Sequence, residues 1–425
     1  MAFILKGSAT LRSSTIIGKP YYPYAINNFV PALVFDFKND YYRTDSVATT
    51  FSTAITHARA SSATMVNSSG VLVTVGNNVA RENHHLYDGV AWVNEGLLQE
   101  SEARTNLLTY SEDFSNAAWA ATQSTLATSA EVGPFSTGQV YSLADNTSAS
   151  THHLQDDNLF TADGVMRTWS IYVKQGTARY IGLTSYSIDY TSTGSSRVIF
   201  DTQVGVYTAQ GAEADILQPA VNVGNGWWRI GFSSDTNGAS YDNFRIEMNS
   251  DGTDSGASYS GSGDTVLLWG AQLEVGSTPS SYIPTSGATA TRAAETLTVP
   301  AAKLPYSSAN ISIQMNGEMT GNTLTLVRWY EDASNAILLD AGTTDFTFTQ
   351  EAAGVVDTVT GGSFISGINV QFNIASRHVT TALNGAVDGT ALTADTTPTA
   401  LPDLSATDLS LGYSYMGTIG KFIVW

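Results

Sequence analysis

The stretch Asn243-Phe-Arg-Ile-Glu-Met248 gives the clearest indication of the fold class, because polar and apolar residues alternate along its whole length. Successive side chains of a β-strand point to opposite faces, so this pattern predicts a strand with one buried and one solvated face. Arg197-Val-Ile-Phe-Asp201 and the run Thr265 to Leu273 are further strand candidates. Clusters of Ser, Gly, Asp and Thr, such as Asn249 to Gly263, separate these runs. The chain is therefore predicted to be all-β.

The composition supports this fold class and excludes others. Hydrophobic residues fill 42% of the 425 positions and charged residues only 13%, which argues against both disorder and helical bundles. The formal net charge of −19 disfavours nucleic acid and anionic membrane surfaces as partners. The sequence has no cysteine and no apolar run long enough for a membrane span. We therefore expect no membrane insertion, and assembly in a reducing cytoplasm.

Four units are predicted along the chain. The first thirty residues contain Lys6, Arg12 and Lys19 but no acidic residue, which is compatible equally with an arm that docks on a partner and with a terminal strand followed by a turn. A stretch rich in Pro, Ser, Thr and Gly, Thr278 to Ala290, marks the main boundary between two β-sandwiches. The units are an N-terminal attachment arm (1–44), a small β unit (45–105), a jelly-roll sandwich (106–286) and a second sandwich (287–425).

Two local patterns in the last unit predict its strand arrangement. Leu383-Asn-Gly-Ala386 predicts a hairpin turn, because Asn-Gly adopts positive φ at low cost. The chain stops at Trp425, inside the apolar run that begins at Thr418. An unpaired apolar edge strand would aggregate, so we expect this final strand to be paired within a sheet.

Catalytic motifs are not found in the sequence. The adjacent histidines at 84–85 and 152–153 would point to opposite faces of a strand, so neither pair is a metal clamp. There is no nucleophile elbow and no phosphate-binding loop. Carboxylate pairs for glycoside hydrolysis, such as Glu100 with Glu102 or Asp156 with Asp157, remain open. We predict that the protein is not an enzyme and requires no cofactor.

Two ligand sites are candidates in the jelly-roll unit. The acids Asp251, Asp254 and Asp264 supply hard oxygen ligands that suit a structural calcium ion, although a polar surface loop is the simpler interpretation. Trp227, Tyr241 and Tyr259 offer aromatic faces on which sugars could stack. Trp227 and Trp228 alternate on a strand, however, so at least one of them is expected to lie in the core.

Two sets of motifs stand at the ends of the third unit. The opening motif is Glu102-Ala-Arg-Thr-Asn-Leu-Leu108 followed by Tyr110 to Trp119, and the closing motif comprises Trp269 to Val275, Ser281 to Thr285 and Thr291 to Ala294. Together with Thr56 to Thr64, these motifs resemble segments of tailed-bacteriophage virion proteins of the tail-fibre or head-fibre type, where they bracket a jelly roll similar to carbohydrate-binding modules.

The last unit resembles concanavalin A and laminin-G sandwiches, through Ala382 to Ala386 and Leu411 to Trp425. The resemblance implies that the Asn106 and Tyr282 motifs fix the two ends of the jelly roll, and that Asp264 helps to bind calcium.

The resemblance predicts a non-enzymatic virion structural protein that attaches the particle to the host surface, with glycans as possible ligands. Its expected partners are other virion proteins, through the N-terminal region, and two further copies of itself in a homotrimer. Its expected location is the virion, after assembly in the host bacterial cytoplasm. The alternatives are a capsid decoration or head-fibre protein, a polysaccharide-degrading virion enzyme and a bacterial surface adhesin.

Overall fold

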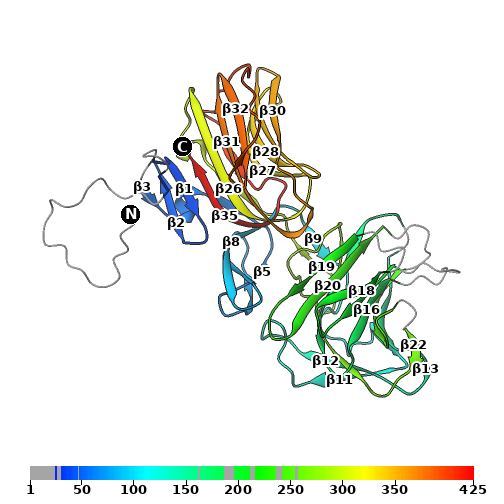
Figure 1. The fold of residues 1–425 in the computed structure, drawn as a ribbon. Coiled ribbons are helices and arrows are strands. Elements are labelled where there is room, and N and C mark those ends of the chain that lie inside the picture. Colours follow the sequence, from blue (N-terminus) through cyan, green and yellow to red (C-terminus); the bar gives the residue numbers. More distant parts are fainter. Residues whose placement is uncertain are drawn as a thin grey trace, which may run out of the picture.

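The structure is a computed structural model that describes residues 24–25, 30–45, 47–160, 163–185, 196–210, 216–235, 242–253 and 257–425. It confirms the predicted all-β class with two β-sandwiches (Figure 1). In these residues, helical structure is limited to α1 (Phe51–Ala54) and the 3-10 turn η1 (Ala301–Lys303). No helix in the described part of the chain is long and apolar enough to cross a membrane.

The first sandwich, here called the host sandwich, combines strands from both ends of the chain. Its larger sheet has the order β3-β2-β1-β35-β26-β31-β32-β33, and β8 joins it beside β35, with β7 paired to β8. These strands are β1 (Leu33–Asp36), β2 (Tyr41–Thr44), β3 (Val47–Thr49), β7 (Arg81–Tyr87), β8 (Trp92–Glu100), β26 (Asn310–Gly321), β31 (Gly367–Val379), β32 (Ala382–Val387), β33 (Thr390–Ala391) and β35 (Met416–Val424).

The opposing sheet of the host sandwich has the order β30-β29-β28-β27-β34-β25-β4. Its strands are β4 (Thr56–Ala58), β25 (Thr296–Val299), β27 (Leu324–Asp332), β28 (Asn335–Ala341), β29 (Phe346–Ala352), β30 (Val355–Gly361) and β34 (Leu409–Leu411). The apolar sides of both sheets meet in one core, in which Trp329, Phe348 and Phe422 are fully buried. The outward side of each strand carries the alternate, mostly polar residues.

The strand pairing differs from the predicted division at residues 44 and 105. We predicted an arm (1–44) and a separate small unit (45–105), but β1 pairs along its whole length with β35 at the end of the chain. Strand β4 pairs with β25, and β8 pairs with β35. Each of these short strands pairs with a strand hundreds of residues away, which local patterns cannot reveal. Residues 1–23 and 26–29, which form most of the predicted arm, lie outside the described residues.

The second sandwich lies within residues 107–289 and has a core of its own. In the core, the ring of Trp169 stacks on Phe232 with centroids 5.0 Å apart and an interplanar angle of 4°. The two sheets have the orders β10-β14-β21-β16-β17-β18 and β11-β12-β23-β15-β20-β19. The strands are β10 (Trp119–Thr122), β11 (Ser124–Ser129), β12 (Val140–Asp145), β14 (His153–Phe160), β15 (Arg167–Gln175), β16 (Tyr180–Ser185), β17 (Ser196–Asp201), β18 (Val206–Gln210), β19 (Ile216–Asn222), β20 (Trp227–Ser234), β21 (Asp242–Asn249) and β23 (Thr265–Val275).

A short ribbon joins the two sandwiches. Strand β9 (Arg104–Asn106) of the opening motif pairs antiparallel with β24 (Ala290–Arg292) of the closing motif, so the chain enters and leaves the second sandwich at one place (Figure 1). The second sandwich is therefore an insertion into the host sandwich, and we call it the inserted sandwich. Two small two-stranded sheets complete the fold: the hairpin of β5 (Ala63–Val66) with β6 (Leu72–Val75), and the long-range antiparallel pair of β13 (Ala149–Thr151) with β22 (Ser258–Ser260).

The predicted hairpin turn at Asn384-Gly385 is wrong, whereas the predicted pairing of the last strand is confirmed. Asn384 and Gly385 lie inside β32, and the turn to β33 is formed by Asp388 (φ 47°) and Gly389 (φ 81°). Gly385 is needed for another reason, because a Cβ at this position would lie 2.4 Å from Cδ2 of Phe348 in the core. Strand β35 pairs with β1 on one side and β26 on the other.

Candidate functional site

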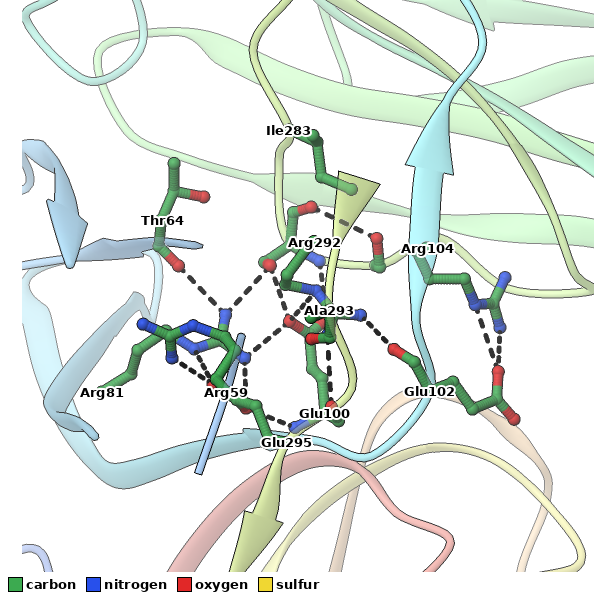
Figure 2. A network of polar contacts seen from close by, with 12 residues as sticks. Arg59, Thr64, Arg81, Glu100, Glu102, Arg104, Ile283, Arg292, Ala293 and Glu295 are labelled. Atoms are coloured by element: carbon green, nitrogen blue, oxygen red, sulfur yellow. Dashed lines mark hydrogen bonds and ion pairs between the residues drawn. The ribbon is translucent and has the colours of Figure 1, made fainter. Parts of the chain in front are cut away.

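A buried charge network occupies the junction between the sandwiches (Figure 2). The Glu295 carboxylate accepts hydrogen bonds from Arg59 Nη1 (2.5 Å), from Arg81 Nε (3.0 Å) and Nη2 (2.6 Å), and from the backbone N–H of Glu100 (2.8 Å). Arg59 and Arg81 side chains are fully buried. Burial alone would raise the pKa of the Glu295 carboxyl, but Arg81, and then His57, outweigh burial and lower this pKa to about 2. Glu295 is therefore an ionised structural anchor.

Glu100 forms the second half of the network. Its carboxylate lies 2.7 Å from Arg81 Nη2 and 3.0 Å from Arg292 Nε, and it accepts hydrogen bonds from the N–H and hydroxyl of Ser281. Burial opposes ionisation, but Arg292 and Arg81 together lower the pKa of Glu100. Glu102 instead pairs with Arg104 at 2.7 Å and is half exposed. Glu100 and Glu102 thus stabilise the junction separately, and they do not form the carboxylate pair that hydrolysis would need.

The motif residues at the ends of the inserted sandwich are structural, as predicted. The Asn106 amide donates to the carbonyls of Ala271 (3.2 Å) and Ile283 (2.9 Å) and accepts from the N–H of Leu108 and Leu273. The buried hydroxyl of Tyr282 donates to Ser111 Oγ at 2.8 Å. These bonds close the sandwich where the chain enters and leaves it.

The predicted calcium ligands lie in different local turns. Asp251 accepts hydrogen bonds from the N–H and hydroxyl of Thr253, and Asp264 accepts one from Ser262 Oγ at 2.6 Å. Asp254 lies outside the described residues. Within the described ranges, no group of three or more His, Asp or Glu side chains is arranged to hold a metal ion. Calcium binding by this loop stays a prediction.

Asp145, which the sequence analysis did not single out, orders this loop. Its Oδ1 accepts hydrogen bonds from the N–H groups of Ser262 (2.9 Å), Gly263 (2.6 Å) and Asp264 (2.9 Å), and its Oδ2 accepts the Tyr259 hydroxyl at 2.8 Å. Burial opposes ionisation of Asp145, but the Tyr259 hydroxyl and these N–H groups lower its pKa. The Asp145 carboxylate therefore fixes the backbone of residues 262–264, the segment in which Asp264 was predicted to bind calcium.

Two of the predicted sugar-stacking residues, Trp227 and Tyr259, are described by the structure, and both are engaged by other residues of the protein. Trp227 is fully buried and donates from Nε1 to the carbonyl of Val132 at 2.9 Å, so the expectation that it meets a ligand is corrected: it is a core residue. Tyr259 packs against His152 and is held by Asp145, and burial raises its pKa. Tyr241 lies outside the described residues. Because Trp227 is fully buried, its ring has no exposed face on which a sugar could stack.

A groove instead crosses the outward face of the larger host sheet, opposite the apolar core. It has a volume of about 800 Å³. One row of residues crosses four neighbouring strands at the same height: Trp425 follows β35, Ser312 is in β26, Arg377 in β31 and Asn384 in β32. Since neighbouring strands lie about 4.8 Å apart, this row spans about 14 Å.

A second row provides the floor and a further polar wall of this groove. Ala375 and Ala386 are direct cross-strand neighbours, and their small side chains leave space between the rows. The Gln314 amide in β26 donates to Asn373 Oδ1 in β31 at 3.0 Å. We call this site the outer-face groove and define it by Ser312, Gln314, Asn373, Ala375, Arg377, Asn384, Ala386 and Trp425.

Two polar atoms of the outer-face groove are buried without a hydrogen-bond partner among the described residues: Oδ1 of Asn384 and Nε1 of Trp425. Both atoms have almost no accessible surface, so the groove presents to a ligand the exposed polar side chains of its lining, such as Asn373 and Arg377. The sequence analysis missed this site because alternate polar residues on a strand are typical of any solvated sheet face. Asn384-Gly385 was noticed in the sequence, but it was interpreted as a turn, and Asn384 was therefore not recognised as a strand residue that lines the groove.

Comparisons with known proteins identify no family. No protein-family model matches the chain, and no curated protein sequence matches it. Among solved structures, the CBM22-1–CBM22-2 tandem domain from Paenibacillus barcinonensis Xyn10C is 11% identical, with 76% of this chain and 98% of that chain covered and a TM-score of 0.29. Domains LG4-5 of the mouse laminin alpha1 chain are 12% identical (64% and 85% covered, TM-score 0.24). Tail fiber protein gp63.1 from E. coli phage G7C is 7% identical (80% and 45% covered, TM-score 0.23). At these scores the likenesses carry no functional argument.

Proposed function

We propose that this chain is a non-enzymatic structural component of a tailed-bacteriophage particle, and that it attaches the particle to glycans on the host surface. The proposal combines the resemblance of the opening and closing motifs with the outer-face groove. In this proposal the protein is a homotrimer, it joins other virion proteins through its N-terminal region, and it is assembled in the host cytoplasm. Weak glycan contacts would then gain strength from the several copies on one particle.

The outer-face groove is the observation that carries the binding part of the proposal. Amides both donate and accept hydrogen bonds, as sugar hydroxyls do, and Gln314, Asn373 and Asn384 place three amides along the groove. The half-buried indole of Trp425 adds an apolar wall. The volume of about 800 Å³ falls within the range of ligand sites in proteins. The groove is also built on strands, which hold its side chains rigidly.

Glycan binding by the full chain tests this part directly. The variants Gln314→Ala and Asn384→Ala, made together, should weaken binding to any glycan that an array identifies by about tenfold, because each neutral hydrogen bond contributes about 0.5–1.5 kcal/mol. Thr358→Ala is the matched control, since Thr358 is exposed on β30 of the opposite sheet. Equal affinities of the double variant and the control would refute the groove as the binding site.

Immunogold labelling of intact particles with an antibody to residues 291–425 tests the virion part. Label at the tail or at fibre tips would support attachment. Label over the head would favour a capsid decoration or head-fibre protein without a receptor role. Particles without label would refute the virion proposal, and the release of new reducing ends from host polysaccharide would then support an enzyme.

A further inference from the structure

The charge of the outer-face groove points to a class of glycan. We infer that the groove binds a carboxylate-bearing saccharide, such as a uronic or sialic acid unit, and that Arg377 receives the carboxylate. This inference rests on the proposed function, because it names the ligand of the same groove. It depends on one feature of the molecule, an unpaired guanidinium in a strongly acidic chain.

Acidic side chains outnumber Lys and Arg by 38 to 19 in this protein. Buried arginines in the described residues are paired accordingly, as Arg59, Arg81 and Arg292 are at the junction. The side chain of Arg377 is exposed and lines the groove, and no ion pair or hydrogen bond links its guanidinium to another described residue. It is also the only charged side chain among the residues that line the groove in the described structure. A cation without a carboxylate partner among the described residues is available for a carboxylate on a ligand.

The neighbours of Arg377 extend this argument from charge to geometry. Ser312 lies directly across from Arg377 on β26, and Asn384 lies directly across from it on β32. A guanidinium offers planar, paired N–H donors that match the two oxygens of a carboxylate. The serine hydroxyl and the asparagine amide on either side can then bind the ring hydroxyls that flank a sugar carboxylate.

The single positive charge of Arg377 favours a ligand with one negative charge over a ligand with two. One guanidinium neutralises one carboxylate, whereas a phosphomonoester carries a charge of about −1.5 to −2 at pH 7. The surplus negative charge would face a protein with a net charge of −19. A carboxylated sugar therefore suits the groove better than a phosphorylated one.

The test uses an array of uronate and sialic acid oligosaccharides, each printed beside its carboxyl-reduced, neutral counterpart and beside phosphorylated sugars. The full wild-type chain should bind the carboxylated members about tenfold or more tightly than the reduced ones, as expected for a charge-assisted contact. Arg377→Gln should remove this preference, and Arg377→Lys should retain part of it. Arg328→Gln is the control, because it removes the same charge from β27 of the opposite sheet, where Arg328 lies over the rings of Tyr330 and Tyr413.

The outcomes separate this inference from the proposed function. If wild type binds reduced or phosphorylated sugars as well as carboxylated ones, and Asn384→Ala still weakens binding, the groove binds glycans but the carboxylate inference is refuted. If neither Arg377→Gln nor Asn384→Ala changes binding, both are refuted. Absence of binding by wild type to any member of the array refutes the carboxylate inference. A change of oligomeric state in Arg377→Gln would assign the groove to a contact between copies of the chain and would also refute the carboxylate inference.

Discussion

The substitution Glu295→Gln tests whether the buried charge network holds the junction together. Glu295 is 1% exposed and accepts bonds from two fully buried arginines, Arg59 and Arg81. Glutamine keeps the size of the side chain but removes its charge, which leaves both guanidinium groups without their shared anion. Loss of one partner from a buried ion pair costs about 3–5 kcal/mol.

The lowered pKa of Glu295 gives a second measure of how much its ionised carboxylate stabilises the folded protein. It falls from 4.5, the ordinary value for glutamate, to about 2 in the folded protein. At about 1.4 kcal/mol per unit, this difference contributes about 3 kcal/mol to the free energy of unfolding at pH 7. Because the folded pKa is depressed, this stabilisation is present above about pH 4.5 and is lost as the pH falls toward 2.

Differential scanning calorimetry of the full chain measures both effects. A loss of 3–5 kcal/mol lowers the melting temperature of a unit of 150–250 residues by about 6–20 °C. Glu102→Gln is the matched control: Glu102 pairs with Arg104 in the same junction but is half exposed, so we expect a loss below about 1 kcal/mol. The reasoning is refuted if the two variants melt together at pH 7, or if Glu295→Gln loses stability on acidification as steeply as wild type does.

Three further predictions concern residues away from the junction. Asp145→Asn should lower the free energy of unfolding by about 1–3 kcal/mol in urea denaturation, since it weakens the acceptor of three backbone N–H groups; an unchanged midpoint would contradict this. Gly385→Ala should cost about 1–3 kcal/mol in thermal unfolding, because its methyl group would overlap Phe348; a wild-type melting temperature would show that the core adapts freely. Trp227→Ala should cost about 3–5 kcal/mol while the folded protein keeps its glycan affinity in titration calorimetry, and a selective loss of affinity would restore Trp227 as a ligand residue.

The candidate site could be predicted from the sequence only in part. The polar residues were visible in part, because Ser312 and Gln314 alternate with apolar residues between Ile311 and Met315. Their assembly was not, because the row from Trp425 to Asn384 depends on the register of four strands. Aromatic residues were the predicted ligand contacts instead, and Trp227 is a buried core residue.

The alternation of polar and apolar residues was enough to predict the β class. The resemblance of the opening and closing motifs predicted where the inserted sandwich begins and ends and the structural role of Asn106, whose amide bonds to backbone groups 165 to 177 positions away. Long-range packing, in contrast, was needed to assign β1, β4 and β8 to the host sandwich, and to bring Arg59 to Glu295 across 236 positions of the chain. The physical reason is that alternation specifies which face of a strand is buried, whereas its neighbours are chosen by the packing of the whole core.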